Sequence, residues 1–385
     1  MVGLKNVVLV KKGDKWFIES LISEYIAQIN DYTVNQILSA KNKKWENLDP
    51  VQKYIFENLI PDVYIDKDGS DIIVKTEGLH SLSIEITSNC NLSCKHCAIR
   101  CGPRTTNPLT LPKKKFTEVL IDAYDLGAYS ISITGGEPFM DDELIEKIKF
   151  CRDLGFKVEI NTNGTLINDD LAKNLHKLEV AHVAVSIDGF KESHEFLRGK
   201  GTFEKAINGL KKLLEYGIEA SVITCVYEKN KDHIDEFYLK MKELGVRGVN
   251  ITPIYPLGRA KNNKELMLPF DELGKIFKKY RNISNDIEKS KEFRELFAIP
   301  CGLFRRTIHI GSNGDVHPCP LFIDFVIDNV YKRRLKEIYE DPPKKVYELL
   351  NLDPRKVKGP IGCRARAYMY TNDLYGEDIF LKFFS

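Results

Sequence analysis

The chain has 385 residues, of which 43% are hydrophobic and 29% are charged, a composition that excludes wholesale disorder and allows two or three domains. Its 57 basic residues nearly balance its 55 acidic residues, which argues against binding nucleic acid through a basic surface. Because no apolar run is long enough for a membrane span and no secretory-signal pattern is visible, we expect a cytoplasmic protein with neither nucleic-acid nor membrane partners.

Residues 1–78 are expected to form a separate domain. Two apolar runs flank a turn at 12–14 and predict a β-hairpin, and short amphipathic helices are predicted over 33–40 and 50–60. A second hairpin is predicted over 63–74. The order of hairpin, helices and hairpin predicts a winged-helix-like domain.

Residues 79–290 alternate apolar strands with amphipathic helices. The predicted strands are centred near Ile84, Ile131, Val158, Ala184, Ser221 and Val249. The helices predicted between them include 113–126, 141–154, 203–216 and 231–244. This alternation predicts parallel strands with right-handed crossovers, in an open barrel or a doubly wound sheet. In either architecture the active site belongs at the carboxyl ends of the strands.

The pattern changes in residues 291–385, which are expected to form a small α+β domain. Apolar positions on both sides of Asn313-Gly314-Asp315 predict a hairpin, with Cys301 before it and Cys319 after it. The lysine-rich stretch 260–292 is expected to be a solvated helix and connector.

Nine cysteines are spread unevenly along the chain, which favours metal or redox chemistry over a disulfide framework. Cys90, Cys94 and Cys97 follow the first strand of the alternating region with the spacing C-x3-C-x2-C. Three thiolates in one loop can hold a single metal centre, and soft sulfur ligands select zinc or an iron–sulfur cluster. They leave a fourth coordination position open for chemistry, unless Cys101 or His96 completes a structural zinc site.

This cysteine motif after the first strand of a βα series resembles that of the radical S-adenosylmethionine (SAM) superfamily. The resemblance implies that Cys90, Cys94 and Cys97 hold a [4Fe–4S] cluster that also binds SAM. It further implies reduction by an electron donor such as flavodoxin or ferredoxin, and a 5′-deoxyadenosyl radical that abstracts hydrogen. The implied fold is α/β: an open (βα)6 partial TIM barrel between the winged-helix-like domain and an auxiliary-cluster domain.

Motifs at the ends of the next strands agree with the resemblance. The segment 134–138 resembles the family's GGEP motif, in which glycines allow close approach and a carboxylate matches the ammonium group of SAM. Ser186 and Arg198 would contact the ribose and the carboxylate. The SAM-binding residues implied in this way are Gly135, Gly136, Glu137, Pro138, Asn161, Ser186 and Arg198. No catalytic residue is assigned beyond the cluster ligands.

A second group of cysteines resembles the SPASM and twitch domains, which bind auxiliary iron–sulfur clusters. Four of the seven SPASM cysteines are absent, so the resemblance implies one auxiliary cluster held by Cys301, Cys319 and Cys363, with its fourth ligand unassigned. A structural zinc ion or a pair of buried thiols is the alternative. Cys151 and Cys225 are expected to be core thiols.

The first domain suggests a substrate. Residues 1–78 resemble the PqqD-like element, which binds leader peptides by adding them as a strand to its sheet edge. The resemblance implies a precursor peptide that is modified by a thioether, a carbon–carbon crosslink or epimerisation. The segment 362–368 also resembles the tails of radical enzymes that tailor haem-like tetrapyrroles, so a tetrapyrrole or other small molecule is the alternative substrate. A non-enzymatic zinc-binding module is a more distant alternative.

Overall fold

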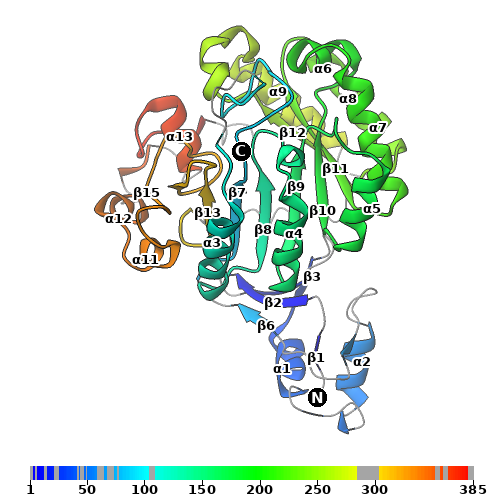
Figure 1. Cartoon of the computed structure of the whole chain (residues 1–385), viewed down its shortest axis with the longest axis vertical. Coiled ribbons are helices and arrows are strands. Elements are labelled where there is room, and N and C mark those ends of the chain that lie inside the picture. Colours follow the sequence, from blue (N-terminus) through cyan, green and yellow to red (C-terminus); the bar gives the residue numbers. More distant parts are fainter. Residues whose placement is uncertain are drawn as a thin grey trace.

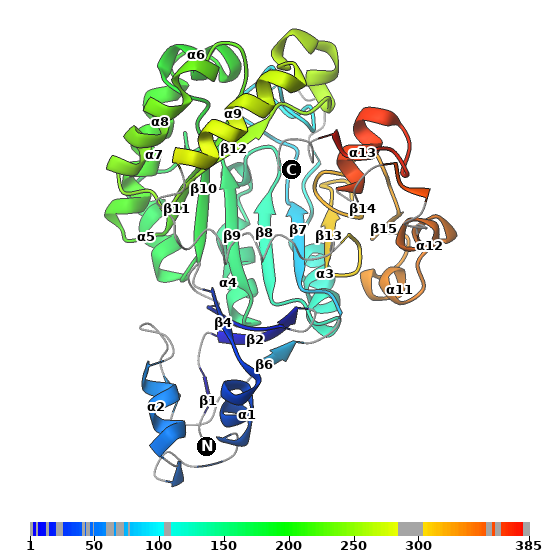
Figure 2. The same cartoon turned by 180° about the vertical axis from the view of Figure 1, so that it is seen from behind.

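The protein is seen here as a computed structural model (Figures 1 and 2). The residues that it describes are 3–4, 7–12, 15–20, 26–40, 43, 47–48, 50–58, 65–66, 73–75, 78–103, 109–283, 303–351, 356–358 and 363–379.

A parallel sheet forms the centre of the molecule, and its strands follow one another in chain order. These strands are β7 (Ser81–Glu85), β8 (Ser130–Thr134), β9 (Lys157–Thr162), β10 (His182–Ser186), β11 (Ala220–Val226) and β12 (Val249–Pro253). All six predicted strands are confirmed. A doubly wound sheet reverses its strand order at a switch point, whereas this order advances in one direction, so the sheet is an open partial barrel.

Helices cover the outer face of the barrel (Figure 1). They are α3 (Lys113–Asp125), α4 (Leu144–Asp153), α5 (Asp169–Lys177), α6 (Lys191–Arg198), α7 (Thr202–Glu215), α8 (Ile234–Glu243) and α9 (Phe270–Ile283). The strand side chains alternate between two faces. Leu82 and Ile84 of β7 pack in the main core with Phe116 of α3, whereas Ser83 and Glu85 face inward. No helix in the described part of the chain is long and apolar enough to cross a membrane.

The amino-terminal domain contains a four-stranded sheet among the described residues, in the order β4 (Ile26–Ile29), β3 (Lys15–Ser20), β2 (Val7–Lys12) and β6 (Ile73–Lys75). Two helices, α1 (Asp31–Ala40) and α2 (Pro50–Asn58), belong to the same domain. The hairpin β2–β3 and both helices were predicted from the sequence, whereas β4 was not. The sheet lies at the end of the barrel where the strands begin (Figure 2). There, Val8 and Val10 pack on Tyr129, whose hydroxyl donates to Glu19 Oε2 at 3.2 Å.

The second predicted hairpin of this domain is wrong. β5 (Ile65–Asp66) pairs with β1 (Gly3–Leu4), and β6 pairs in parallel with β2. Two apolar runs around a polar turn have the same sequence pattern whether they pair with each other or with other strands. Here each run pairs with a strand from elsewhere in the chain. Sequence periodicity therefore found the strands but could not choose their partners.

The carboxy-terminal region extends the barrel sheet. β13 (Thr307–Ile310) and β14 (Asp315–His317) form the predicted hairpin, and β15 (Asp328–Asn329) follows. β13 also pairs in parallel with β7, which the sequence did not predict. The described residues of this region also form the helices α11 (Leu335–Glu340), α12 (Lys344–Leu350) and α13 (Arg364–Thr371). Arg334 donates from Nε and Nη2 to the two carboxylate oxygens of Asp122 on α3, at 2.9 and 2.6 Å, which fixes this region against the barrel.

The packing of α3 gives a test of the barrel core. Phe116 is fully buried, whereas Ile121 on the same helix is 41% exposed. We expect Phe116→Ala to lower the free energy of unfolding by about 3–5 kcal/mol, because it leaves a cavity. Ile121→Ala should change it by about 0.5 kcal/mol or less. Urea unfolding of the full chain, followed by circular dichroism, compares the two, and equal effects would contradict the packing described here.

Candidate functional site

The predicted cysteine ligands lie in one loop at the carboxyl end of β7. Cys90, Cys94 and Cys97 group with Cys101 and Leu92, and Cys90 and Cys94 are almost entirely buried. Burial raises the pKa of Cys90 to about 12, whereas a hydrogen bond with Cys101 lowers the pKa of Cys97 to about 6. Soft thiols gathered in a buried loop fit an iron–sulfur cluster. Because thiolates bind iron, cluster loading must remove the proton from Cys90.

The GGEP loop lies directly against the cysteine loop. Gly136 N donates to Thr87 O at 2.7 Å, and Glu137 N donates to Asn89 O at 2.8 Å. A Cβ atom at Gly136 would lie 2.2 Å from Asn89 O, and one at Gly135 would lie 2.4 Å from Thr87 O. These glycines are therefore required because the backbone of the cysteine loop occupies the space of their side chains.

Glu137 joins the GGEP loop to the end of β9. Its buried carboxylate accepts hydrogen bonds from Thr162 Oγ1 at 2.7 Å and Asn163 N at 2.8 Å. Burial raises the pKa of Glu137 to about 7, although these hydrogen bonds favour its charged form. Pro138 follows as the first residue of a short 3₁₀ helix, Pro138–Met140. The contact of Glu137 with SAM stays a prediction.

Two other predicted residues lie on the barrel strands. Asn161 of β9 donates from Nδ2 to Ser132 Oγ of the neighbouring β8 at 3.0 Å. Ser186 is the last residue of β10 and is half-buried. Both are therefore at or near the carboxyl ends of strands that are neighbours in the sheet. Their contact with a bound ligand stays a prediction.

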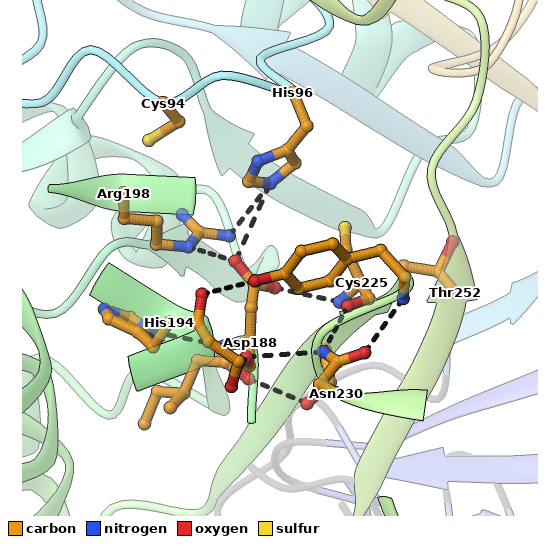
Figure 3. Close-up of polar contacts among 12 residues, drawn as sticks. Cys94, His96, Asp188, His194, Arg198, Cys225, Asn230 and Thr252 are labelled. Atoms are coloured by element: carbon orange, nitrogen blue, oxygen red, sulfur yellow. Dashed lines mark hydrogen bonds and ion pairs between the residues drawn. The ribbon is translucent and has the colours of Figure 1, made fainter. Parts of the chain in front are cut away.

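A buried ion pair joins the loop after β10 to the end of α6, and His96 of the cysteine loop lies beside it (Figure 3). Asp188 Oδ2 accepts from Arg198 Nε at 2.6 Å and lies 3.7 Å from His96 Nε2. Burial alone would raise the pKa of Asp188, but the charge of Arg198, with His96, lowers it to about 2. The predicted SAM ligand Arg198 is thus held by Asp188 beside Cys94, as Figure 3 shows.

His96 presents an unused polar atom in this network. Its side chain is 10% exposed, and among the described residues its Nδ1 is buried without a hydrogen-bond partner. Burial lowers the pKa of His96 to about 4, so the ring is neutral near pH 7. A buried orphan nitrogen next to the cysteines fits a site that is completed by a polar ligand such as SAM.

Cys225 packs against an apolar cluster that includes Leu197 and Tyr227, as expected for a core thiol, but it also contacts the polar network. Its backbone N–H donates to Asp188 Oδ1 at 2.9 Å. Its sulfur, a ring nitrogen of His96 and a carboxylate oxygen of Asp188 all lie within 4.8 Å of one another (Figure 3). The period of two along β11 places Cys225 on the inner face of the barrel, whereas the sequence pattern only marked it as apolar. Cys151, by contrast, is fully buried in the main core, as predicted.

The segment after β12 contains a residue that sequence reasoning missed. Arg259 donates from Nε to Cys94 O and from Nη2 to Cys101 O, both at 2.7 Å. A Cβ atom at the preceding Gly258 would lie 2.1 Å from Ala98 O, and the φ of this glycine is +49°. The sequence offers one signal for Arg259 as a site residue, namely its position after the last barrel strand. The residues that follow it have the pattern of a solvated lysine-rich stretch, which hides this signal.

The predicted auxiliary ligands lie in the carboxy-terminal region. Cys319 and Cys363 pack against one apolar group that includes Leu303 and Phe322. The backbone N–H of Cys363 donates to Asp378 Oδ2 at 2.7 Å, which fixes the start of α13. Cys301 lies outside the described residues. The described pair fits the predicted second centre, and the full ligand set stays a prediction.

Comparison with known proteins agrees with these two centres. A model of the radical SAM superfamily matches residues 84–241, and a model of the SPASM iron–sulfur cluster-binding domain matches residues 301–360. Neither match extends to residues 1–78. The resemblance of that domain to PqqD therefore stays a prediction.

Individual relatives include enzymes that act on different molecules. The chain is 26% identical over 350 residues to the AdoMet-dependent heme synthase of Methanosarcina barkeri, over 80% of this chain and 97% of that protein. It is 27% identical over 278 residues to the antilisterial bacteriocin subtilosin biosynthesis protein AlbA of Bacillus subtilis, over 69% of this chain and 60% of that protein. The structure of Streptococcus suis SuiB bound to precursor peptide SuiA has the same fold, with a TM-score of 0.67 at 16% identity, over 95% of this chain and 96% of that one.

The close contact at Gly136 predicts a specific defect. In Gly136→Ala, the new Cβ would meet Asn89 O and displace the cysteine loop, so we expect a large loss of iron after anaerobic cluster reconstitution. Gly248→Ala is the matched control, because a Cβ there meets no atom within 4 Å. Iron and sulfide per chain, with circular dichroism as a folding control, are the measurements. Equal iron content in both variants would show that the glycine contact does not position the ligands.

Proposed function

Because this chain is a radical SAM enzyme with a SPASM-type iron–sulfur domain, we propose that it modifies a ribosomally synthesised peptide. The observation that supports a peptide substrate is the edge of the amino-terminal sheet. Among the described residues, β4 is the edge strand and pairs with no strand on its outer side. An edge strand offers unpaired backbone groups to an extended peptide.

Each cysteine group has a separate role in this proposal. Cys90, Cys94 and Cys97 would hold a [4Fe–4S] cluster, and SAM would bind at the same site. When bound there, SAM supplies a 5′-deoxyadenosyl radical that removes a hydrogen atom from the substrate. Cys319 and Cys363, together with Cys301, hold an auxiliary cluster.

The barrel residues position SAM and exclude water. The GGEP loop would bind the methionine amino group, and Ser186 and Arg198 would contact the ribose and the carboxylate. Asn161 would also contact SAM. The inner face of the barrel is polar at Ser83 and Glu85, and His309 lies between them, with Nδ1 3.0 Å from Ser83 Oγ and Nε2 3.2 Å from Glu85 Oε1. These three buried side chains hold one another in place and join β13 to β7 on this face of the sheet.

The peptide itself would bind to residues 1–78, with residues 79–290 as the radical domain and 291–385 as the auxiliary domain. Relatives named for bacteriocin biosynthesis and a structural neighbour with a bound precursor peptide support this choice. The product would be a thioether, a carbon–carbon crosslink or an epimerised residue. A flavodoxin or ferredoxin would supply the electron.

A haem-like tetrapyrrole is the second candidate substrate. The support for it is the heme synthase of Methanosarcina barkeri, because the alignment covers 97% of that protein. The tail at 362–368 also resembles the tails of tetrapyrrole-tailoring enzymes. This candidate leaves the radical chemistry unchanged and gives residues 1–78 no peptide to bind.

The cluster assignment can be tested on single cysteines. Cys94→Ala removes one of three ligands, so we expect no detectable 5′-deoxyadenosine from SAM and dithionite and a loss of the cluster absorbance. Cys151→Ala is the control, because this buried cysteine lies on α4, outside the site. 5′-Deoxyadenosine is measured by chromatography. Full activity of Cys94→Ala would refute the assignment.

The peptide substrate can be tested on the full chain with short peptides encoded beside its gene. Trp16 of β3 pairs with Ile29 of β4, so its fluorescence should report a strand added to β4. The protein has two tryptophans, and a Trp45→Phe background leaves Trp16 as the reporter. We expect saturable micromolar binding that Gln28→Pro abolishes, since proline cannot sustain strand pairing at β4, and that Gln28→Val preserves. Binding of a haem precursor instead would favour the second candidate.

A further inference from the structure

A small cationic surface covers the outer side of the cysteine loop. We call it the cysteine-loop patch; it consists of Lys95, Phe196 and Lys229. Lys95 lies between Cys94 and Cys97 in the sequence and is exposed. Its Nζ is 3.5 Å from the ring centroid of Phe196, and Lys229 Nζ is 4.8 Å from the same centroid. Two ammonium groups from different loops therefore share one aromatic ring.

The patch is held by buried neighbours. The Phe196 ring is 36% exposed and stacks on the fully buried Tyr227, with ring centroids 6.1 Å apart and an interplanar angle of 11°. The Tyr227 hydroxyl donates to Ser193 O at 2.7 Å. The backbone N–H of Lys95 donates to Leu197 O at 2.9 Å. The two positive charges are thus presented on a fixed base rather than on a loose loop.

The two ammonium groups of the patch form no ion pair with a carboxylate in the part of the chain that the structure describes. Within the described ranges, neither Lys95 nor Lys229 has a carboxylate within ion-pair distance, whereas the neighbouring Lys231 pairs with both Glu228 and Glu272 at 2.9 Å. Two uncompensated cations on one ring repel each other. A partner that places carboxylates on the patch would remove this repulsion, so the patch is complementary to an acidic surface.

The position of the patch indicates which acidic partner it serves. Cys94 lies directly before Lys95 in the loop and is 9% exposed, so the loop separates the buried thiols from solvent at this point. The peptide-binding edge proposed above, β4, belongs to the domain at the opposite end of the barrel (Figures 1 and 2). A partner bound to the patch would therefore contact the cysteine loop from its solvent side, at the residue next to Cys94.

We propose that the cysteine-loop patch is the docking surface for a small acidic one-electron carrier protein. This inference rests on the proposed function, because it requires a cluster held by Cys90, Cys94 and Cys97. The reduced carrier loses one electron and the cluster gains one. No covalent bond forms or breaks and no proton is transferred, so the step needs no further reactant.

The experiment uses full-length, cluster-loaded protein and a flavodoxin as the probe. Its dissociation constant is measured by titration at low and at high ionic strength for Lys229→Gln, Lys95→Gln and the double variant. Lys173→Gln is the matched control, an exposed lysine on α5. We expect each patch substitution to weaken binding about threefold at low salt, the double variant to weaken it by about tenfold, and the control to leave it unchanged. High salt should remove the differences.

Reduction of the cluster separates the possible outcomes. The decay of cluster absorbance is followed with reduced flavodoxin and, separately, with dithionite. Slower reduction by flavodoxin together with normal reduction by dithionite supports the docking surface. The docking surface is refuted if Lys229→Gln and the double variant bind flavodoxin and are reduced by it as the unsubstituted protein is. It is also refuted if the patch binds an acidic precursor peptide instead of flavodoxin. Failure of the unsubstituted protein to hold a cluster that dithionite reduces would refute the proposed function itself.

Discussion

The site depends on a close contact between two stretches of backbone. The carbonyl oxygens of Thr87 and Asn89 lie where side chains would begin at Gly135 and Gly136, and two backbone hydrogen bonds fix the distance. These stretches follow β7 and β8, which are paired strands of the barrel. Because backbone packs on backbone with no flexible side chain between, the position of the cysteine loop follows from the register of the sheet.

Contacts from the other side of the barrel complete this constraint. Asp188 and Arg198 reach the loop from the end of β10, and Arg259 reaches it from beyond β12. β12 is at one end of the strand order, while β7 is five strands away. Only curvature of the sheet can bring side chains that follow β12 against a loop that follows β7. The open barrel is thus a requirement of this cysteine site.

Local patterns predicted the elements well where each pattern has one structural solution. The alternation of apolar strands and amphipathic helices predicted the parallel strands of the sheet, and the C-x3-C-x2-C spacing predicted the cluster loop. The choice of an open barrel over a doubly wound sheet came from the family resemblance and not from these patterns. Reasoning from local patterns failed at the second amino-terminal hairpin, because β6 takes β2 as its partner. It also missed that β13 pairs with β7, since a pairing across more than 200 positions leaves no local trace.

The sequence by itself determined which chemistry to expect: thiols at cluster spacing, a GGEP motif and a second cysteine group resemble a radical SAM enzyme with an auxiliary iron–sulfur domain, and matches to both family models agree. The tertiary structure decided how these residues are held. It gave Gly136 its packing role, joined the expected core thiol Cys225 to the polar network as well, and assigned Arg259 to the cysteine loop. The reason is physical. Ligand spacing is a property of one short segment, whereas orientation and support come from segments that meet only when the sheet has curved into the open barrel.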